Sequence, residues 1–318
     1  MKRALFYAAG SAELGYGHLY RILGILNDLK SNLFYTVFVT NDVQEDFCNN
    51  HGIRCTKTLP DRLDLLVIDS KEDVLPFSIH SILNDCKPLF IAIDTFCDWR
   101  NLADFIISPT FYSEKMLNFS EQQNFIGGRE FVSIRPGVDT PLQVRDILVT
   151  FGGSDPNNIT KLALDAITEL NLQEHTNVIL GPGYKGSFHF MKRSFPKVHF
   201  YSSVDATIEF VRNSNIVVTA LGTTVNEIEF TKRYGFLIFN YSTDECEFPY
   251  LLSASTQQEK WISFGMFSQF DLLNFKLQLQ KYISRGSAHN FDTISNLNKT
   301  AQFISHKLSE TTETSTLN

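Results

Sequence analysis

The chain has 318 residues, of which 43% are hydrophobic and 20% are charged. This length and composition are typical of a globular protein with two domains, each large enough to bury its own core. A net charge of −7 and a sequence pI near 5.6 argue against a dedicated nucleic-acid-binding protein, which would carry a basic face.

No targeting or membrane segment is predicted. The apolar run after Lys2-Arg3 has only seven residues and ends at Gly10, which is too short for a signal peptide. No stretch approaches the ~18 consecutive apolar residues of a membrane span. The five cysteines are an odd number without a C-x-x-C pair, so we expect neither a zinc knuckle nor a disulfide framework. These features favour a cytoplasmic protein without an integral membrane segment.

Short apolar runs alternate with amphipathic stretches along most of the chain. In the first half, strands are expected at residues 4–8, 34–40, 65–69, 89–94 and 105–108, with helices at 18–30 and 77–85. In the second half, strands are expected at 146–151, 177–180, 198–201, 216–219 and 236–239, with helices at 159–170, 206–213, 225–232, 271–282 and 293–308. Continuous apolar strands separated by helices predict parallel sheets covered on both faces.

A domain boundary is expected between about residues 113 and 145, where the alternation weakens and glycine and proline gather. We therefore divide the chain into an N-terminal Rossmann-like domain (1–142), a C-terminal Rossmann-like domain (143–308) and a disordered tail (309–318). Ligands of open α/β sheets bind beyond the carboxyl ends of the strands, so a cleft between two facing sheets is the expected site.

The first candidate loop runs from Gly10 to Arg21. Gly15 and Gly17 allow a ligand to approach the backbone closely, and His18 stands where a helix begins. A helix N-terminus favours an anion and disfavours imidazolium, so His18 is expected to be neutral and able to accept a proton. Arg21 follows one turn later on the same face. The alternative is a tight turn with a polar capping residue.

The second candidate loop, Gly152-Gly153-Ser154-Asp155, follows the first strand of the second half. Two glycines and a serine before a helix build a nest of N–H donors that fits a pyrophosphate. Neither a Rossmann G-x-G-x-x-G nor a P-loop lysine is present, and a capped helix with an incidental glycine pair is the alternative.

The third candidate loop contains Gly222, Thr223, Thr224, Asn226 and Glu227. Thr224 and Glu227 have capping-box spacing, so both can be purely structural. Glu227 can instead accept hydrogen bonds from ribose hydroxyls, and the Asn226 amide can present a donor and an acceptor to a ligand.

Asp69 and Asp94 each end an apolar run in the first half and are expected to project toward the cleft. Acidic residues at strand ends can bind ligands, and helix capping is the competing interpretation. The remaining histidines have no metal-ligand spacing and there is no D-x-D motif, so neither a metal nor a cofactor is expected.

Taken together, the three loops resemble a known family. The motifs E-L-G-Y-G-H-x-x-R (13–21), F-G-G-S-D-P-N-N-I-T (151–160) and G-T-T-V-N-E (222–227) resemble the pseudaminic-acid-pathway UDP-sugar hydrolases and the related spore-coat polysaccharide glycosyltransferases. Residues 125–136 look like the segment between the domains of that family. The resemblance implies the GT-B fold: two Rossmann-like domains with parallel sheets facing across a cleft, and C-terminal helices.

The resemblance also implies roles for single residues. His18 would be the catalytic base and Arg21 a nearby cation, while Gly153 and Ser154 would hold the pyrophosphate. It further places the ribose at Glu227, the sugar or its phosphates at Asn226 and the uracil edge at the backbone of Val204. The stretch Asp69-Ser70-Lys71-Glu72 departs from the family's Asp-His-Tyr-Gly, and Ile93-Asp94-Thr95-Phe96 lacks its paired acids.

The predicted reaction is hydrolysis of a UDP-linked amino-deoxy sugar, in which His18 activates the water that attacks the anomeric carbon. A glycosyltransferase would use the same groups, with His18 acting on a sugar hydroxyl. A non-catalytic nucleotide-sugar sensor is the third interpretation. The substrate is expected to be a UDP-sugar of surface-polysaccharide or nonulosonic-acid biosynthesis.

Overall fold

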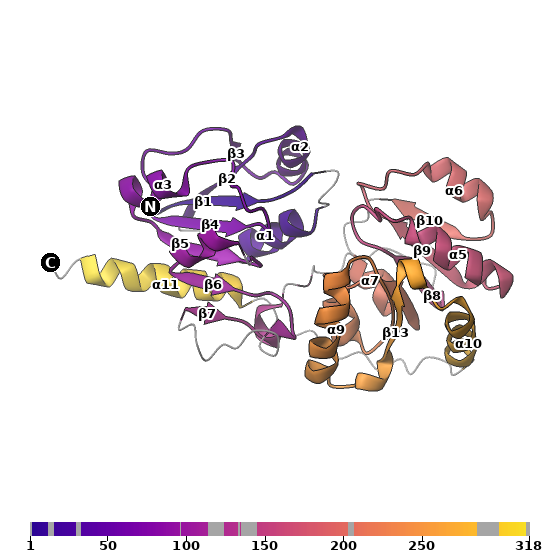
Figure 1. Ribbon diagram of the computed structural model, residues 1–318. Coiled ribbons are helices and arrows are strands. Elements are labelled where there is room, and N and C mark those ends of the chain that lie inside the picture. The colour runs from indigo at the N-terminus through magenta and orange to yellow at the C-terminus, as the bar shows by residue number, and fades with distance from the viewer. Residues whose placement is uncertain are drawn as a thin grey trace. The chain divides into compact units, whose positions relative to one another are not determined.

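The computed structural model describes residues 2–11, 16–29, 33–95, 97–113, 124–132, 134, 145–202, 207–284 and 299–315, with side chains of the last helix described up to residue 310. The chain forms two compact units. Unit 1 combines most of the chain up to Ser133 with Asn296–Asn318, and unit 2 comprises Ile134–Ser295. Each unit is an α/β layer structure (Figure 1).

Unit 1 is built on a seven-stranded parallel sheet in the order β3-β2-β1-β4-β5-β6-β7. Its strands are β1 (Lys2–Ala8), β2 (Leu33–Phe38), β3 (Cys55–Thr56), β4 (Leu65–Asp69), β5 (Leu89–Ile93), β6 (Phe105–Ile107) and β7 (Phe125–Ile126). Its helices are α1 (Gly17–Asp28), α2 (Asp42–Asn50), α3 (Ile79–Cys86) and α11 (Thr300–Ser315), with 3₁₀ turns η1 (Asp98–Leu102) and η3 (Arg129–Phe131).

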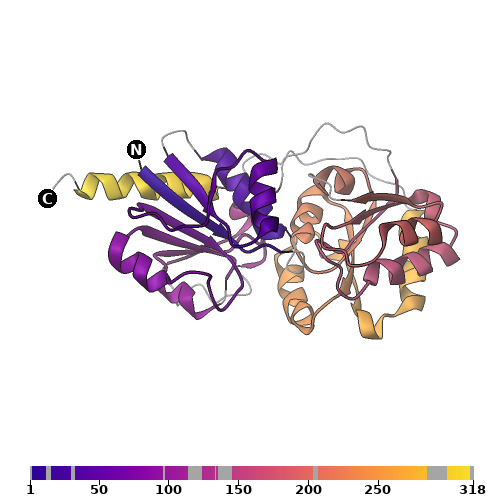
Figure 2. The ribbon, with the colours of Figure 1, turned by 90° about the horizontal axis from the view of Figure 1, so that it is seen from above.

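Both faces of this sheet are covered, because side chains of each strand alternate between two cores. Ala4, Phe6 and Ala8 of β1 join the core formed with α1, α2 and α11. Leu5 and Tyr7 join the core formed with α3 on the other face. Figure 2 shows helices on both faces of the sheet. Every residue of β4 is buried, as expected for a central strand.

Unit 2 is built on a six-stranded parallel sheet in the order β10-β9-β8-β11-β12-β13. Its strands are β8 (Ile147–Thr150), β9 (Thr176–Leu180), β10 (His199–Ser202), β11 (Ile216–Thr219), β12 (Tyr234–Phe239) and β13 (Trp261–Met266). Its helices are α5 (Ile159–Glu169), α6 (Phe188–Ser194), α7 (Thr207–Arg212), α8 (Thr224–Thr231), α9 (Ser242–Ala254) and α10 (Leu272–Ile283), with 3₁₀ turns η4 (Gln173–His175), η5 (Gln258–Lys260) and η6 (Phe267–Gln269).

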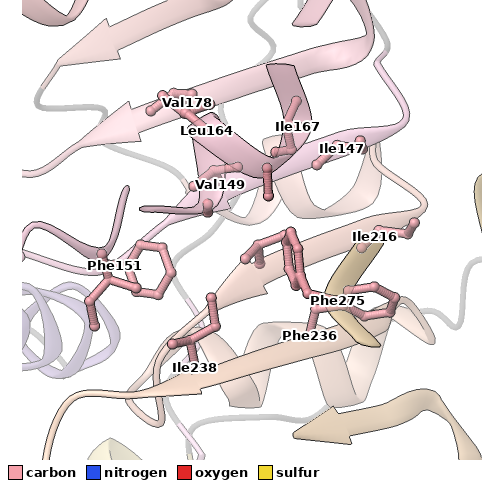
Figure 3. Packing of buried hydrophobic residues seen from close by; sticks show 14 of the residues in the cluster. Ile147, Val149, Phe151, Leu164, Ile167, Val178, Ile216, Phe236, Ile238 and Phe275 are labelled. Atoms are coloured by element: carbon pink, nitrogen blue, oxygen red, sulfur yellow. The ribbon is translucent and has the colours of Figure 1, made fainter. Parts of the chain in front are cut away.

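The core of unit 2 lies between its sheet and the helices α5 and α10. Figure 3 shows Val149 of β8 and Phe236 of β12 with Leu164 of α5 and Phe275 of α10. All four side chains are fully buried. This core orients the strands, and so determines where the loops at their carboxyl ends lie.

The C-terminal helix corrects two predictions. The expected disordered tail began at residue 309, but α11 continues to Ser315. It also belongs to unit 1 and not to the C-terminal domain, since Ala301, Ile304 and Leu308 lie in the core with α1. These three residues are spaced at i, i+3 and i+7, and this apolar face needs a partner that the first sheet supplies.

The boundary and some elements also differ from prediction. The units divide at residue 134 instead of 142. Phe125–Ile126, expected in an interdomain segment, is the edge strand β7, which pairs with β6. The elements α2, β3, α6, α9 and β13 were not predicted. Within the described residues, no helix is long and apolar enough to cross a membrane.

Candidate functional site

The polar residues predicted in the first half meet at one point of the unit 1 sheet. The chain adds β2 and β3 on one side of β1 and β4 to β7 on the other, so the strand order reverses between β1 and β4. This reversal is where open α/β sheets bind ligands. His18 lies in the first turn of α1, the helix that follows β1. Asp69 is the last residue of β4, and Asp94 follows β5 directly.

His18, Arg21, Asp69 and Asp94 form one hydrogen-bonded cluster. His18 Nδ1 lies 2.5 Å from Asp69 Oδ1. Arg21 donates from Nε to Asp69 Oδ2 at 2.7 Å, and from Nη2 to Asp69 Oδ1 and Asp94 Oδ2, both at 2.8 Å. The Asp69 side chain is fully buried and that of His18 is 16% exposed. The cluster therefore connects three strand ends around a buried ion pair.

These contacts assign the tautomer of His18. Arg21 Nη2 also lies 2.9 Å from His18 Nδ1, but its two hydrogens are used by Asp69 Oδ1 and Asp94 Oδ2. A carboxylate oxygen at 2.5 Å can only accept from the ring. We therefore assign a proton to Nδ1, which donates to Asp69, so that Nε2 is the nitrogen at which the ring can gain or lose its second proton.

The charges of the cluster stabilise one another. Burial alone raises the pKa of Asp94, but Lys71, Arg21 and His18 outweigh it and hold the pKa at about 2. Burial likewise raises the pKa of Asp69, and Arg21 and His18 reverse this to a value below the ordinary range. Burial lowers the pKa of Arg21, yet the two carboxylates raise it above its usual value. Both carboxylates are thus ionised near neutral pH.

The cluster contains a set of atoms with metal-ligand geometry, since a ring nitrogen of His18 and carboxylate oxygens of Asp69 and Asp94 lie within 4.8 Å of one another. Arg21 Nη2 lies within 2.9 Å of all three side chains. A guanidinium in this position repels a second cation. The donor set therefore fits the arginine and not a divalent metal ion.

In unit 2 the predicted loops also flank a reversal of strand order. The sheet extends from β8 through β9 to β10 on one side, and through β11 and β12 to β13 on the other. The loop containing Gly152, Gly153 and Ser154 follows β8, and Gly222 and Thr223 follow β11. The carboxyl ends of neighbouring parallel strands share one edge, so the two loops lie side by side there.

The loop after β8 packs closely against its neighbours. Gly152 has a left-handed φ of 74°, which favours glycine. Gly183 N donates to Gly153 O at 2.7 Å, and a Cβ at Gly181 would collide with the carbonyl oxygens of Gly152 and Gly153. Asn157 Nδ2 donates to Asn240 Oδ1 at 3.0 Å, which connects this loop to the end of β12.

The helix N-termini behind the two loops differ in their caps. The buried Asp155 carboxylate accepts from Ile159 N at 2.8 Å and Thr160 N at 3.0 Å, and so caps α5. At α8 the N-cap is Thr223, whose side chain makes no capping hydrogen bond. An added anion is therefore accommodated better by the N-terminus of α8 than by that of α5.

The structure settles several alternatives left open by the sequence. Asp69 and Asp94 bind Arg21 and do not cap the following helix, whose N-cap is Ser78 for α3 and Cys97 for η1. Thr224 and Glu227 have capping-box spacing, but the N-cap residue of α8 is Thr223, and Thr224 lies inside the helix.

The other predicted residues differ in exposure. Arg21 was expected as a cation within reach of a ligand; it is 6% exposed and binds the two carboxylates. Asn226 and Glu227 are also buried in α8, while Gly152, Gly222 and Thr223 are exposed. Gly15 and Val204 lie outside the described residues. That the two sets of loops face one another across a cleft stays a prediction.

Two residues important to these sites were missed by the sequence reasoning. Asp155 was recognised as part of its loop but not as the cap of α5, although an aspartate shortly before a helix is a common capping signal. Lys71 Nζ lies 3.7 Å from Asp94 Oδ1. In the sequence, only its position two residues after the strand β4 indicated that Lys71 could lie near the site.

Comparison with known proteins identifies the fold. No protein-family model matches the chain. A curated relative, the uncharacterized protein MJ1062 of Methanocaldococcus jannaschii, is 25% identical over an alignment of 253 residues that covers 70% of this chain. The chain spans about half the length of this relative (52%).

Solved structures match over nearly the whole chain at low identity. The glycotransferase of kitacinnamycin has a TM-score of 0.61 at 10% identity, covering 96% of this chain and 95% of its own. Acinetobacter baumannii MurG has a TM-score of 0.57 at 8% identity, covering 98% and 100%. The co-structure of S. aureus MnaA with UDP has a TM-score of 0.57 at 9% identity, covering 96% and 95%. With its two parallel sheets and their helices, the chain has the two-domain, Rossmann-like GT-B fold.

Proposed function

We propose that the chain cleaves the bond between the diphosphate of UDP and the anomeric carbon of a sugar, with the nucleotide bound by unit 2 and the general base on unit 1. The proposal rests on the contact of His18 Nδ1 with Asp69 at the strand reversal of unit 1. A ring whose Nδ1–H is held by a carboxylate presents a basic Nε2, as general-base catalysis requires. The bound UDP of one structural neighbour supports the choice of nucleotide.

In this proposal the diphosphate binds the N-terminus of α8 and the glycine loop after β8. Thr223 and Thr224 would offer N–H groups at the positive end of the helix dipole. Gly152, Gly153 and Ser154 would surround the other phosphate oxygens. Following the family resemblance, Glu227 would bind the ribose, Asn226 would lie beside the sugar or its phosphates, and Val204 would contact the uracil edge.

The reaction needs one proton transfer and one substitution. His18 Nε2 takes a proton from water while the water oxygen attacks the anomeric carbon. The bond from that carbon to the β-phosphate oxygen breaks, and its electron pair leaves with UDP. Asp69 stabilises the imidazolium that forms, and the N–H groups at α8 stabilise the charge growing on the diphosphate. Water as the acceptor is the reaction of the pseudaminic-acid-pathway hydrolases.

Transfer to a sugar hydroxyl is the second candidate, favoured by the structural similarity to the glycotransferase of kitacinnamycin. The acceptor distinguishes the two reactions. Incubation with UDP-N-acetylglucosamine and no acceptor is expected to release UDP, measured by a coupled UDP assay. Release that requires an added acceptor would favour the transferase. If no UDP is released with a panel of UDP-sugars and acceptors, the proposal is wrong.

Phosphate binding at α8 can be tested at Gly222. A Cβ built there meets no atom within 4 Å, and φ is not in the left-handed range, so a larger residue fits the fold. Gly222→Leu is expected to weaken UDP binding about tenfold or more, because the side chain would occupy the space of a phosphate. Calorimetric titration with UDP measures this, with Gly222→Ala as the smaller control and the melting temperature as the check of folding. Unchanged affinity would place the diphosphate elsewhere.

A further inference from the structure

One charged group beside Asp94 makes no hydrogen bond within the cluster described above. Lys71 stands two residues after β4, between the loops that carry His18 and Asp94. Its side chain is 58% exposed, whereas those of Arg21, Asp69 and Asp94 are 6%, 0% and 13% exposed. Lys71 is therefore the most exposed of these four charged side chains.

The ammonium group of Lys71 is only loosely held. Nζ lies 3.7 Å from Asp94 Oδ1, which is beyond hydrogen-bond distance. Among the described residues, Lys71 Nζ donates no hydrogen bond. Asp94 is already bound by Arg21 at 2.8 Å. Three N–H donors of Lys71 thus remain for a ligand.

The backbone that carries Lys71 is, in contrast, firmly placed. Ser70 is fully buried, and its hydroxyl donates to Glu72 Oε2 at 3.2 Å and accepts from Glu72 N at 3.0 Å. Tyr7 donates to Glu72 Oε2 at 2.7 Å, and Trp99 Nε1 donates to the Glu72 carbonyl at 2.9 Å. A fixed loop with a free cationic tip is suited to binding an anion.

The other charged groups around Lys71 are mostly acidic. Asp69, Asp94 and Arg21 leave the cluster with one net negative charge, and Glu72 and Asp73 follow Lys71 in the same loop, so this edge would otherwise repel an anionic ligand from His18. Lys71 offsets part of this negative charge beside Asp94. Because Lys71 is 58% exposed and Asp94 only 13%, the lysine is the member of this pair that a ligand from solvent can contact.

We propose that Lys71 recognises a carboxylate or phosphate group on the sugar or acceptor that reaches His18, so that the preferred substrate is an acidic sugar derivative. This inference rests on the proposed function. The same ligand chemistry has two sources, the sugar of the nucleotide-sugar and a free acceptor, and the test separates them.

The first arm compares UDP-glucuronate with UDP-glucose, which differ in a carboxylate at C6. Calorimetric titration of the full chain is expected to show UDP-glucuronate binding about tenfold more tightly. Lys71→Gln should abolish the difference without changing the melting temperature. Lys57→Gln is the matched control and should keep it, because Lys57 is equally exposed (58%) and pairs with Glu45 elsewhere in unit 1.

The second arm uses NMR to measure the binding of glucuronate, glucose 6-phosphate and glucose, each with and without saturating UDP. If both anions bind and glucose does not, and if Lys71→Gln removes this binding, the acceptor is the anionic partner. If neither arm depends on Lys71 while UDP and UDP-glucose bind, the inference is overturned and the proposed function stands. If UDP does not bind but glucuronate binding depends on Lys71, the inference stands and the proposed function falls.

Discussion

His18→Ala is expected to lower UDP-sugar turnover by roughly 10²–10⁴-fold, the usual contribution of a general base. The affinity for UDP should hardly change, because the nucleotide is assigned to unit 2. Steady-state release of UDP measures turnover, and calorimetric titration measures the affinity. His306→Ala is the control, since that histidine is 68% exposed on α11.

A second substitution separates proton transfer from the hydrogen bond to Asp69. The amide of His18→Asn can replace Nδ1 as the donor to Asp69 Oδ1, but it supplies no base in place of Nε2. It should therefore be as inactive as the alanine variant while remaining as stable as the wild type. If the asparagine variant keeps its turnover, or if UDP affinity collapses with either change, His18 is not the base.

Arg21→Met is expected to lower the free energy of unfolding of unit 1 by about 3–5 kcal/mol. Removing the guanidinium leaves the buried carboxylates of Asp69 and Asp94 without their principal partner, and an uncompensated buried charge is costly. Arg62→Met is the matched control, because Arg62 is 78% exposed and lies 3.8 Å from Asp64. An exposed pair of this kind contributes about 0–1 kcal/mol.

The measurement can be made specific to unit 1. The chain has two tryptophans, the buried Trp99 in unit 1 and Trp261 in unit 2. In a Trp261→Phe background, the fluorescence of Trp99 reports urea unfolding of unit 1 alone. Equal unfolding free energies for Arg21→Met and Arg62→Met would contradict the importance of the buried ion pairs.

The same ion pairs predict how stability responds to acid. The pKa of Asp94 is about 2 in the folded protein, and that of Asp69 is also lowered, whereas the unfolded groups titrate near 3.8. The contribution of these carboxylates is therefore present above about pH 4 and is lost as the pH falls through the folded pKa of Asp94. This acid-induced loss should be smaller in Arg21→Met than in the wild type.

The sequence alone determined which segments form the two sheets. The strand β11 was predicted at its observed residues, and the fully buried β4 likewise, because both are central parallel strands that are apolar up to their last residue. The elements that were missed have weaker patterns. The helix α2 has the sequence Asp-Val-Gln-Glu-Asp-Phe-Cys-Asn-Asn, in which only Phe47 and its neighbour Cys48 are apolar buried residues.

The candidate residues were also found from the sequence, because glycines, histidine and carboxylates at strand ends are local signals. The residues to which they bond were not found from the sequence. Asp69 and Asp94 are 48 and 73 residues from Arg21, and no local pattern states that one guanidinium binds both. The order of strands in the sheet brings them together, and that order is a property of the packed molecule.

Tertiary structure alone decided the place of α11, whose apolar face could pack against either unit; Ile304 lies in the core of unit 1. The cap of α5 is local by comparison, because Asp155 accepts hydrogen bonds from amides only four and five residues later. Local sequence specifies what a segment needs to bury or bond, but only the folded chain selects the surface or atom that satisfies the need.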